Sequence, residues 1–305
     1  MRDIVIIGTG AAGMTAAIYA ARYNLKAVLL IGEKRGGTAT EASEIENYPG
    51  FKKITGLELM EKFREHVQNF DIKIIDQKVS KVQKKDSGFL VEVGDDKFEA
   101  RTLVLALGTN RRRLGVPGEA EFTNKGVAYC ATCDAPFFKG KTVAVVGGGN
   151  SATMSATLLT QYCPKVYMII RGDKLRGEPI WIDRVNSNER VEIIYNTNVK
   201  KISGTSRIEK LELDNPYNGN KDFPIDGLFI EIGSLPANEL ARQLGIKLNK
   251  QGRIIVDSRQ MTSLEGVFAA GDITDKTGDF EQVVNSCAQG AKASYEAFQF
   301  LQDKG

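Results

Sequence analysis

Two residue types that often carry enzyme chemistry are scarce in this chain of 305 residues, which has one histidine and four cysteines. The histidine, His66, lies in a segment of helical periodicity, residues 56–69. We interpret it as a surface residue and not as part of a Ser-His-Asp or Cys-His mechanism. A structural zinc site needs a second CxxC or a pair of histidines, so no metal site is expected. Four cysteines are also too few for the disulfide scaffold of a secreted domain.

The chain also lacks a strong excess of charge and any long apolar run. Its net charge of +3 is too small to indicate a nucleic-acid partner. No uncharged apolar stretch has the length that crosses a bilayer. Glycines interrupt the apolar start of the chain, unlike that of a signal peptide. These absences predict a globular cytoplasmic protein without nucleic-acid or membrane partners, and the length allows two domains.

A glycine fingerprint stands near the start of the chain. The pattern predicts a strand at 4–7, a turn at 8–13, a helix at 14–23 and a second strand at 27–31. In this setting the glycines let the backbone approach a pyrophosphate at the helix N-terminus, where free N–H groups favour an anion. Glu33, shortly after the second strand, is a candidate for a ribose contact. A turn that serves packing alone fits this context less well.

The same pattern returns later in the chain. It predicts a strand at 142–146, a turn at 147–152, a helix at 153–161 and a strand at 166–170. Between the two units, residues 79–105 alternate between apolar and polar and predict antiparallel strands. A third glycine segment, at 266–272, precedes an apolar helical stretch at 284–301.

These repeats predict an α/β fold with two Rossmann-like domains, the second inserted into the first. The first domain would comprise residues 1–115 and 245–305, and the inserted domain residues 116–244. Pro117-Gly118 and Gly233–Pro236 are the candidate hinges.

Cys130 and Cys133 form a CxxC motif, and Asp134 follows directly. Two cysteines at this spacing close a small disulfide that is readily reduced, and flanking dinucleotide-binding units indicate a source of electrons. Asp134 is then a candidate proton donor. A structural disulfide or a metal site fits this setting less well. We interpret Cys163 and Cys287 as buried residues without a role in the chemistry.

Five motifs in order make the chain recognisable. They are residues 8–13, Glu46-Asn47-Tyr48-Pro49-Gly50, Cys130-Ala131-Thr132-Cys133-Asp134, residues 147–152 and Ala270-Gly271-Asp272. Their order and spacing resemble the low-molecular-weight thioredoxin reductases over essentially the whole chain. The resemblance implies FAD in the first domain and an NAD(P)H-binding-like inserted domain. It also implies a homodimer, and a domain rotation that presents the disulfide alternately to the flavin and to thioredoxin or a thioredoxin-like protein.

The resemblance implies roles for single residues as well. Cys133 corresponds to the thiol that faces the flavin, Cys130 to the thiol that attacks the substrate disulfide, and Asp134 to the acid that protonates a leaving thiolate. Glycines at the first turn would contact the FAD pyrophosphate, Asp272 the ribitol, and the start of the last helix the pyrimidine edge. The full set of candidate FAD-binding residues is Gly8, Gly10, Ala11, Ala12, Gly13, Glu33, Asn47, Gly108, Gly271, Asp272, Gln282 and Val283.

The inserted domain departs from the family after its second strand. Relatives that use NADPH carry a His-Arg-Arg-x-x-x-Arg run whose cations hold the 2′-phosphate. This chain keeps two of the cations, but Ile170 replaces the histidine, Gly172 replaces the second arginine and Asp173 adds a negative charge. Losing one bidentate charged contact costs on the order of a few kcal/mol. We therefore treat the following residues as the remnant of an NADP site: Gly147, Gly149, Asn150, Ser151, Ala152, Arg171 and Arg176.

The altered run makes NADPH a doubtful donor, and we favour reduced ferredoxin, which serves some members of the family with degraded motifs. Ferredoxin is acidic, and Arg111-Arg112-Arg113 with Lys139 and Lys141 would offer a basic docking face. A solvated hinge surface is the simpler interpretation of that run. Three alternatives stay open: a conventional NADPH-dependent thioredoxin reductase, a dithiol oxidase that uses oxygen, and a non-catalytic flavoprotein redox sensor.

Overall fold

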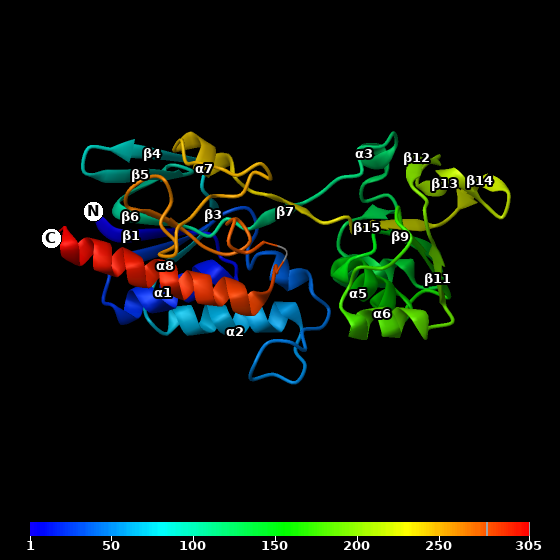
Figure 1. The fold of residues 1–305 in the computed structure, drawn as a ribbon, viewed down its shortest axis with the longest axis horizontal. Helices are drawn as coiled ribbons and strands as arrows, with labels where there is room; N and C mark the ends of the chain where they lie inside the picture. Colours follow the sequence, from blue (N-terminus) through cyan, green and yellow to red (C-terminus); the bar gives the residue numbers. More distant parts are fainter. Residues whose placement is uncertain (279, 305) are drawn as a thin grey trace. The chain divides into compact units, whose positions relative to one another are not determined.

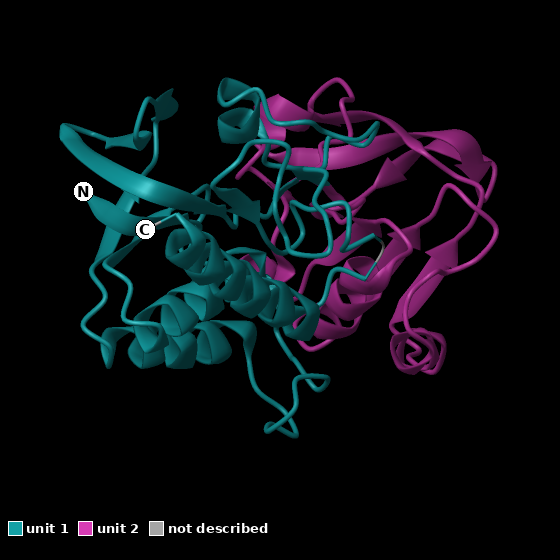
Figure 2. Ribbon diagram, turned by 60° about the vertical axis from the view of Figure 1, so that its left-hand side comes forward, with its two compact units in different colours: residues 1–110, 235–305 teal, residues 111–234 magenta. Residues whose placement is uncertain are grey.

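The two glycine turns lie in different units of the structure, a computed structural model that describes residues 1–278 and 280–304. Unit 1 comprises Met1–Asn110 and Leu235–Gly305, and unit 2 comprises Arg111–Ser234 (Figure 2). Unit 2 is thus inserted into unit 1, as the fold class predicts. Short strands at the two chain crossings, β7 (Thr109–Arg111) and β16 (Ser234–Pro236), pair with each other.

The chain passes from one unit to the other at positions that differ from the domain boundaries predicted from the sequence. The predicted boundaries, 115/116 and 244/245, lie five and ten residues farther along the chain than the observed ones, 110/111 and 234/235. Pro117-Gly118 is inside unit 2, where Gly118 has a φ of +89° and precedes a short helix. The proline and glycine therefore serve a local turn, while the first crossing takes place within a paired strand.

Unit 1 is built on a seven-stranded sheet in the order β3-β2-β1-β6-β5-β4, with β17 also paired to β6. β1, β2, β3, β17 and the second half of β6 run parallel, whereas β4 and β5 form an antiparallel meander with the first half of β6. The meander confirms the antiparallel strands expected within 79–105. The strands are β1 (Arg2–Ile7), β2 (Ala27–Ile31), β3 (Ile74–Lys78), β4 (Lys81–Lys85), β5 (Gly88–Val93), β6 (Asp96–Leu105) and β17 (Val267–Ala269).

Apolar runs in β1 and β2 are buried on both faces of this sheet. Ile4 and Ile6 face the helical side, and Val5 and Ile7 face the side of the meander. Figure 1 shows α1, α2 and α8 together on one side of the sheet. Helices α1 and α8 approach so closely that a Cβ on Gly290 would lie 2.1 Å from the carbonyl oxygen of Ala12. The helices of unit 1 are α1 (Ala11–Arg22), α2 (Gly56–Gln68), α7 (Glu239–Gln243) and α8 (Val283–Asp303), with a 3₁₀ turn η1 (Thr38–Glu41).

Unit 2 combines a five-stranded parallel sheet, in the order β11-β10-β9-β15-β8, with a three-stranded antiparallel sheet, β12-β13-β14. The parallel strands are β8 (Val127–Ala128), β9 (Thr142–Val146), β10 (Lys165–Ile169), β11 (Val191–Ile194) and β15 (Gly227–Ile230). The antiparallel strands are β12 (Val199–Gly204), β13 (Ile208–Tyr217) and β14 (Asn220–Pro224). The helices are α3 (Glu119–Phe122), α4 (Ala131–Asp134), α5 (Asn150–Leu159) and α6 (Pro179–Asn186), with a 3₁₀ turn η2 (Ala135–Phe138).

Both helices that follow a glycine turn begin earlier than the sequence pattern predicts. Helix α1 begins at Ala11 instead of Met14, and α5 begins at Asn150 instead of Thr153. The reason is that the residues of the fingerprint already form the first helical turn, after Gly10 and Gly149 as N-caps. Across residues 1–278 and 280–304, no helix is long and apolar enough to cross a membrane.

Candidate active site

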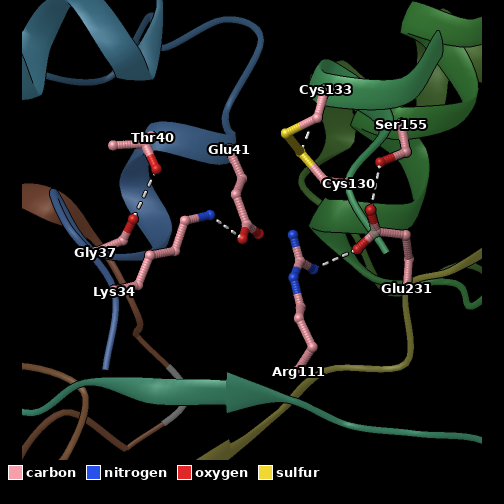
Figure 3. Close-up of a disulfide and its surroundings, with 9 residues drawn as sticks. All are labelled: Lys34, Gly37, Thr40, Glu41, Arg111, Cys130, Cys133, Ser155 and Glu231. Atoms are coloured by element: carbon pink, nitrogen blue, oxygen red, sulfur yellow. Dashed lines mark hydrogen bonds and ion pairs between the residues drawn. A yellow bond between two sulfur atoms is a disulfide. The ribbon is translucent and has the colours of Figure 1, made fainter. Parts of the chain in front are cut away.

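The predicted redox pair forms a disulfide in unit 2 (Figure 3). The Cα atoms of Cys130 and Cys133 are 5.4 Å apart, within the range that disulfides adopt. Cys130 is the extended N-cap of α4, and its Sγ accepts a hydrogen bond from the Cys133 backbone N–H at 3.2 Å. Cys130 is half-buried and Cys133 is exposed. The single helical turn α4 therefore holds the two sulfurs together in unit 2, with the Cys133 side exposed.

Asp134 is half-buried in the last position of α4. Burial raises the pKa of its carboxyl above the ordinary value of 3.8. A raised pKa keeps the proton on the carboxyl to higher pH, which suits a group that protonates a leaving thiolate. Its place directly after Cys133 suits the proton-donor role expected from the sequence.

The first glycine turn is closed by contacts that leave no space for side chains. A Cβ on Gly8, whose φ is +122°, would lie 2.0 Å from the Ala106 carbonyl oxygen, and a Cβ on Gly13 would lie 1.7 Å from the Gly8 oxygen. Gly10 caps α1 without any side-chain hydrogen bond. The first N–H groups of α1 are thus left for an external acceptor, and the turn fits the pyrophosphate of FAD.

Residues far apart in the sequence meet at the start of α8. Asn47 Nδ2 donates to Gln282 Oε1 at 3.0 Å, although 235 positions separate the two residues. Ser286 Oγ donates to Asp272 Oδ1 at 3.2 Å. Loss of solvation, and secondarily the charge of Glu281, raises the pKa of Asp272 to about 6. A carboxylate in this state gains from additional hydroxyl donors, so these residues fit the ribitol chain of FAD.

The remaining candidates in unit 1 occupy less decisive positions. The Gly271 N–H donates to Gln289 Oε1 at 3.0 Å, and a Cβ on Gly108 would meet no atom within 4 Å. Val283 is the half-buried first residue of α8. Glu33 accepts a hydrogen bond from Lys78 Nζ at 2.8 Å, so a ribose hydroxyl would share its carboxylate with a lysine. The contacts of these residues with FAD stay predictions.

The second glycine turn resembles the first in its backbone, but a residue of this turn, Asn150, is hydrogen-bonded to Glu178 of the same unit. A Cβ on Gly147, whose φ is +134°, would lie 2.1 Å from the Glu231 carbonyl oxygen. Asn150 Oδ1 accepts the Glu178 backbone N–H at 2.5 Å, and Asn150 Nδ2 donates to Glu178 Oε1 at 3.3 Å. Ala152 is fully buried and Ser151 is exposed.

The segment after β10 carries the departures from the family pattern. Ile170 is buried, and its Cγ2 would lie 3.1 Å from a Cβ on Gly148, so an apolar side chain covers this part of the turn. Arg171 and Arg176 are exposed, and neither forms an ion pair with any residue that the structure describes. This segment therefore has two exposed cations and an apolar residue where the family pattern has a histidine, and its contacts with a nucleotide stay predictions.

Sequence reasoning missed a buried carboxylate beside the second turn. Glu231 follows β15, is 4% exposed, and accepts hydrogen bonds from Ser155 Oγ at 2.8 Å and from Arg111 Nη1 (Figure 3). Its only signal in the sequence is an acid between Ile230 and Ile232. Since a buried ionised group needs partners, that position could have prompted a search for a cation.

Two of the three arginines at 111–113 form side-chain contacts with other residues of unit 2. Arg111 pairs with Glu231, and Arg113 Nη1 donates to the Tyr129 hydroxyl at 3.0 Å. Arg112 is exposed, and its side chain has no partner in the described part of the chain. Two of the three arginines thus have a structural use, which favours the simpler of the two interpretations of this run.

The other single residues behave as follows. His66 is exposed, as predicted. Cys163 is buried, its Sγ donates to the Phe138 carbonyl oxygen at 3.3 Å, and burial raises its pKa to about 11. Cys287 is half-buried, contrary to the expectation of burial, and its Sγ lies 3.9 Å from the Tyr48 hydroxyl. Among the described side chains, no group of three or more potential metal ligands occurs.

Comparison with known proteins covers both units. The family model described as pyridine nucleotide-disulphide oxidoreductase matches residues 2–290. The chain is similar to a thioredoxin reductase of Mycolicibacterium smegmatis, with 39% identity over 307 residues that span 100% of this chain and 98% of the relative. Among solved structures it is similar to Lactococcus lactis thioredoxin reductase, with a TM-score of 0.94, 35% identity, and coverage of 99% of this chain and 100% of that chain. It is also similar to a ferredoxin-flavin thioredoxin reductase of Clostridium acetobutylicum, with a TM-score of 0.54, 32% identity, and coverage of 99% and 98%.

Proposed function

The chain belongs to the pyridine nucleotide-disulphide oxidoreductases and, within them, to the thioredoxin reductases, and from this premise we propose that it reduces thioredoxin or a thioredoxin-like protein through Cys130 and Cys133. The observation that carries the proposal is the disulfide at α4, with Cys133 exposed and with Asp134, whose pKa burial raises, directly after it. When bound, FAD supplies the electron pair that opens this disulfide.

The two sulfurs then perform thiol–disulfide exchange. The Cys130 thiolate attacks a sulfur of the substrate disulfide, which breaks the substrate S–S bond and forms a mixed disulfide. The Cys133 thiolate attacks the Cys130 sulfur, releases the substrate as a dithiol and restores the Cys130–Cys133 bond. Asp134 gives a proton to a leaving thiolate in this sequence.

An exposed aromatic residue supports a protein substrate. Phe137 follows the CxxC segment in η2 and is 80% exposed. A large apolar side chain so close to a reactive disulfide gives a partner protein an apolar contact that positions its own disulfide.

For the electron donor we propose reduced ferredoxin, with NADPH as the second candidate. Ile170 over Gly148 and the absence of a second arginine at Gly172 support the ferredoxin proposal, as does the name of the Clostridium acetobutylicum relative. The unpaired cations of Arg171 and Arg176 favour NADPH. A homodimer and a cytoplasmic location also stay proposals from the resemblance, and sedimentation equilibrium tests the dimer.

Thiol counting tests the reductase proposal without regard to the donor. The flavoprotein is reduced anaerobically with dithionite, excess dithionite is removed, and oxidised thioredoxin is added. We expect up to two thioredoxin disulfides to be reduced per reduced enzyme, one by the Cys130–Cys133 dithiol and one by the electron pair of the reduced flavin, and none with Cys130→Ser. Cys163→Ser, which alters a buried cysteine, is the control and should behave as the unsubstituted protein. Full thioredoxin reduction by Cys130→Ser would refute the proposed role of that residue.

A further inference from the structure

Tyr129, the residue directly before Cys130, is held from two sides. Its hydroxyl donates to Glu119 Oε1 at 2.6 Å and accepts from Arg113 Nη1 at 3.0 Å. The Arg113 guanidinium carbon also lies 5.1 Å from the centre of the tyrosine ring. The ring itself packs against the apolar cluster of unit 2 that includes Phe122. Tyr129 is therefore fixed both by its ring and by its hydroxyl.

Glu119, which accepts the hydrogen bond from the Tyr129 hydroxyl, is itself held in place by further hydrogen bonds. It is 4% exposed, and besides Tyr129 it accepts the backbone N–H groups of Leu114 at 3.1 Å and Gly115 at 2.7 Å. A buried carboxylate with three donors is held in one geometry, because moving it would leave buried groups unpaired. Glu119 thus ties the first loop of unit 2 to the segment that leads into the disulfide.

The elements around Cys130 are short and depend on tertiary contacts: β8 pairs with β15, and Ala131 is buried in the core of unit 2. The preceding strand, β8, has two residues, and α4 has four. Elements this short have few hydrogen bonds of their own and do not persist without tertiary contacts. The contact from the Cys133 N–H to Cys130 Sγ is internal to the same turn. Tyr129, directly before Cys130, adds to these contacts a side-chain anchor that does not depend on the S–S bond.

We propose that Glu119, Tyr129 and Arg113 form a clamp that keeps Cys130 within bonding distance of Cys133 in the dithiol state. The clamp is a positioning device and acts through the backbone of Cys130. It rests on the proposed function because it requires a pair that cycles between disulfide and dithiol. Two electrons and two protons convert the S–S bond into two thiols, and the reverse step closes it. Holding the thiols together raises their effective concentration and favours the closed form.

A redox equilibrium tests the clamp apart from turnover. The flavoprotein is equilibrated anaerobically over a series of reduced-to-oxidised dithiothreitol ratios. In this exchange dithiothreitol gives two electrons and two protons to the protein disulfide and closes its own ring disulfide. Thiols are trapped with a maleimide, and mass spectrometry measures the reduced fraction of the peptide that contains Cys130 and Cys133.

Each variant alters one member of the clamp. Tyr129→Phe removes the hydroxyl, Glu119→Gln removes the charge of the carboxylate that accepts from it, and Arg113→Ala removes the guanidinium that donates to it. We expect the equilibrium constant for reduction to rise about three- to tenfold in Tyr129→Phe, where tenfold corresponds to about 30 mV. The matched controls are Tyr195→Phe, at a tyrosine of unit 2 that is 40% exposed, and Arg112→Ala. Both controls should titrate with the unsubstituted protein.

The outcomes separate the clamp from the proposed function. Equilibrium constants within about twofold of the unsubstituted protein in both Tyr129→Phe and Arg113→Ala would refute the clamp, because a tenfold change is readily resolved. If Glu119→Gln does not fold, the equilibrium constant of Tyr129→Phe still tests the clamp. A disulfide that stays closed at every ratio in the unsubstituted protein would overturn the proposed function and the clamp with it.

Discussion

The two glycine turns follow the same backbone path in units with different side chains. Gly8 and Gly147 have φ values of +122° and +134°, and a Cβ on either would lie 2.0 or 2.1 Å from a carbonyl oxygen after a neighbouring strand. Glycine is required at both positions by the close approach of the chain, with or without a ligand. A preserved fingerprint therefore reports the fold, and the ligand has to be inferred from the side chains around it.

Those side chains differ between the two turns. Unit 1 brings Asn47 to Gln282, and its Asp272 has a raised pKa and accepts a hydrogen bond from the Ser286 hydroxyl. Unit 2 has Ile170 packed over its turn and two exposed arginines nearby. The side chains of the first turn thus fit FAD, whereas the second turn has the same glycine frame with an apolar residue over it, which supports the proposal of a weakened nucleotide site.

The largest expected effect comes from the third position of each turn. A methyl group at Gly13 would lie 1.7 Å from the Gly8 oxygen, whereas Ala152 fits its place with full burial. We expect Gly13→Ala to cost about 3 kcal/mol of folding free energy and to abolish flavin binding. The reverse change, Ala152→Gly, should cost about 1 kcal/mol and leave the flavin in place. Thermal unfolding and the flavin absorbance of the purified variants check both, and equal effects of the two changes would contradict the difference in packing.

The buried carboxylate of unit 2 gives the next effect. Glu231→Ala removes the partner of Arg111 and of Ser155, so we expect a loss of about 2 to 3 kcal/mol in the free energy of unfolding. Asp222→Asn breaks the exposed ion pair with Lys210 and should cost less than about 0.5 kcal/mol. Urea unfolding measures both variants. A Glu231 variant as stable as the Asp222 variant would show that the buried pair contributes nothing.

The raised pKa of Asp272 makes the free energy of unfolding depend on pH. Its pKa is about 6 in the folded chain and 3.8 as the ordinary value. As the pH rises through this window, the unfolded carboxyl loses its proton first, so the free energy of unfolding should fall by about 3 kcal/mol. Asp272→Asn removes this slope. Urea unfolding of both proteins at a series of pH values checks the difference, and parallel curves would be incompatible with the raised pKa.

The smallest effect would restore a cation to the second turn. Gly172 has an ordinary backbone conformation, so Gly172→Arg introduces a guanidinium beside Arg171 without strain. We expect NADPH to bind about tenfold more tightly, equivalent to about 1.4 kcal/mol. NADH is the matched control, since it lacks the 2′-phosphate and its affinity should not change. Calorimetric titration of both nucleotides measures the difference, and an equal gain for NADH would point to a cause other than the phosphate.

The parts of the fold that follow from local pattern were predictable. Strands β2 and β9 have the predicted bounds because each apolar run ends directly before a glycine, Gly32 or Gly147. The starts of α1 and α5 were not, since the fingerprint residues carry no apolar periodicity. The contact of Asn47 with Gln282 spans most of the chain and could be anticipated only from the family resemblance. Glu231 was missed because a single acid in an apolar run does not reveal its partner.

Anaerobic mixing with candidate donors tests most directly the proposed difference between the two turns, an FAD site in unit 1 and a weakened nucleotide site in unit 2. The oxidised protein is mixed with NADPH, NADH or reduced ferredoxin, and the decrease in flavin absorbance is followed with time. Our account predicts rapid loss of the absorbance with reduced ferredoxin and slow or no loss with either nucleotide at concentrations on the order of micromolar. Rapid loss with NADPH at those concentrations would contradict it and would show that Arg171 and Arg176 suffice for a working site.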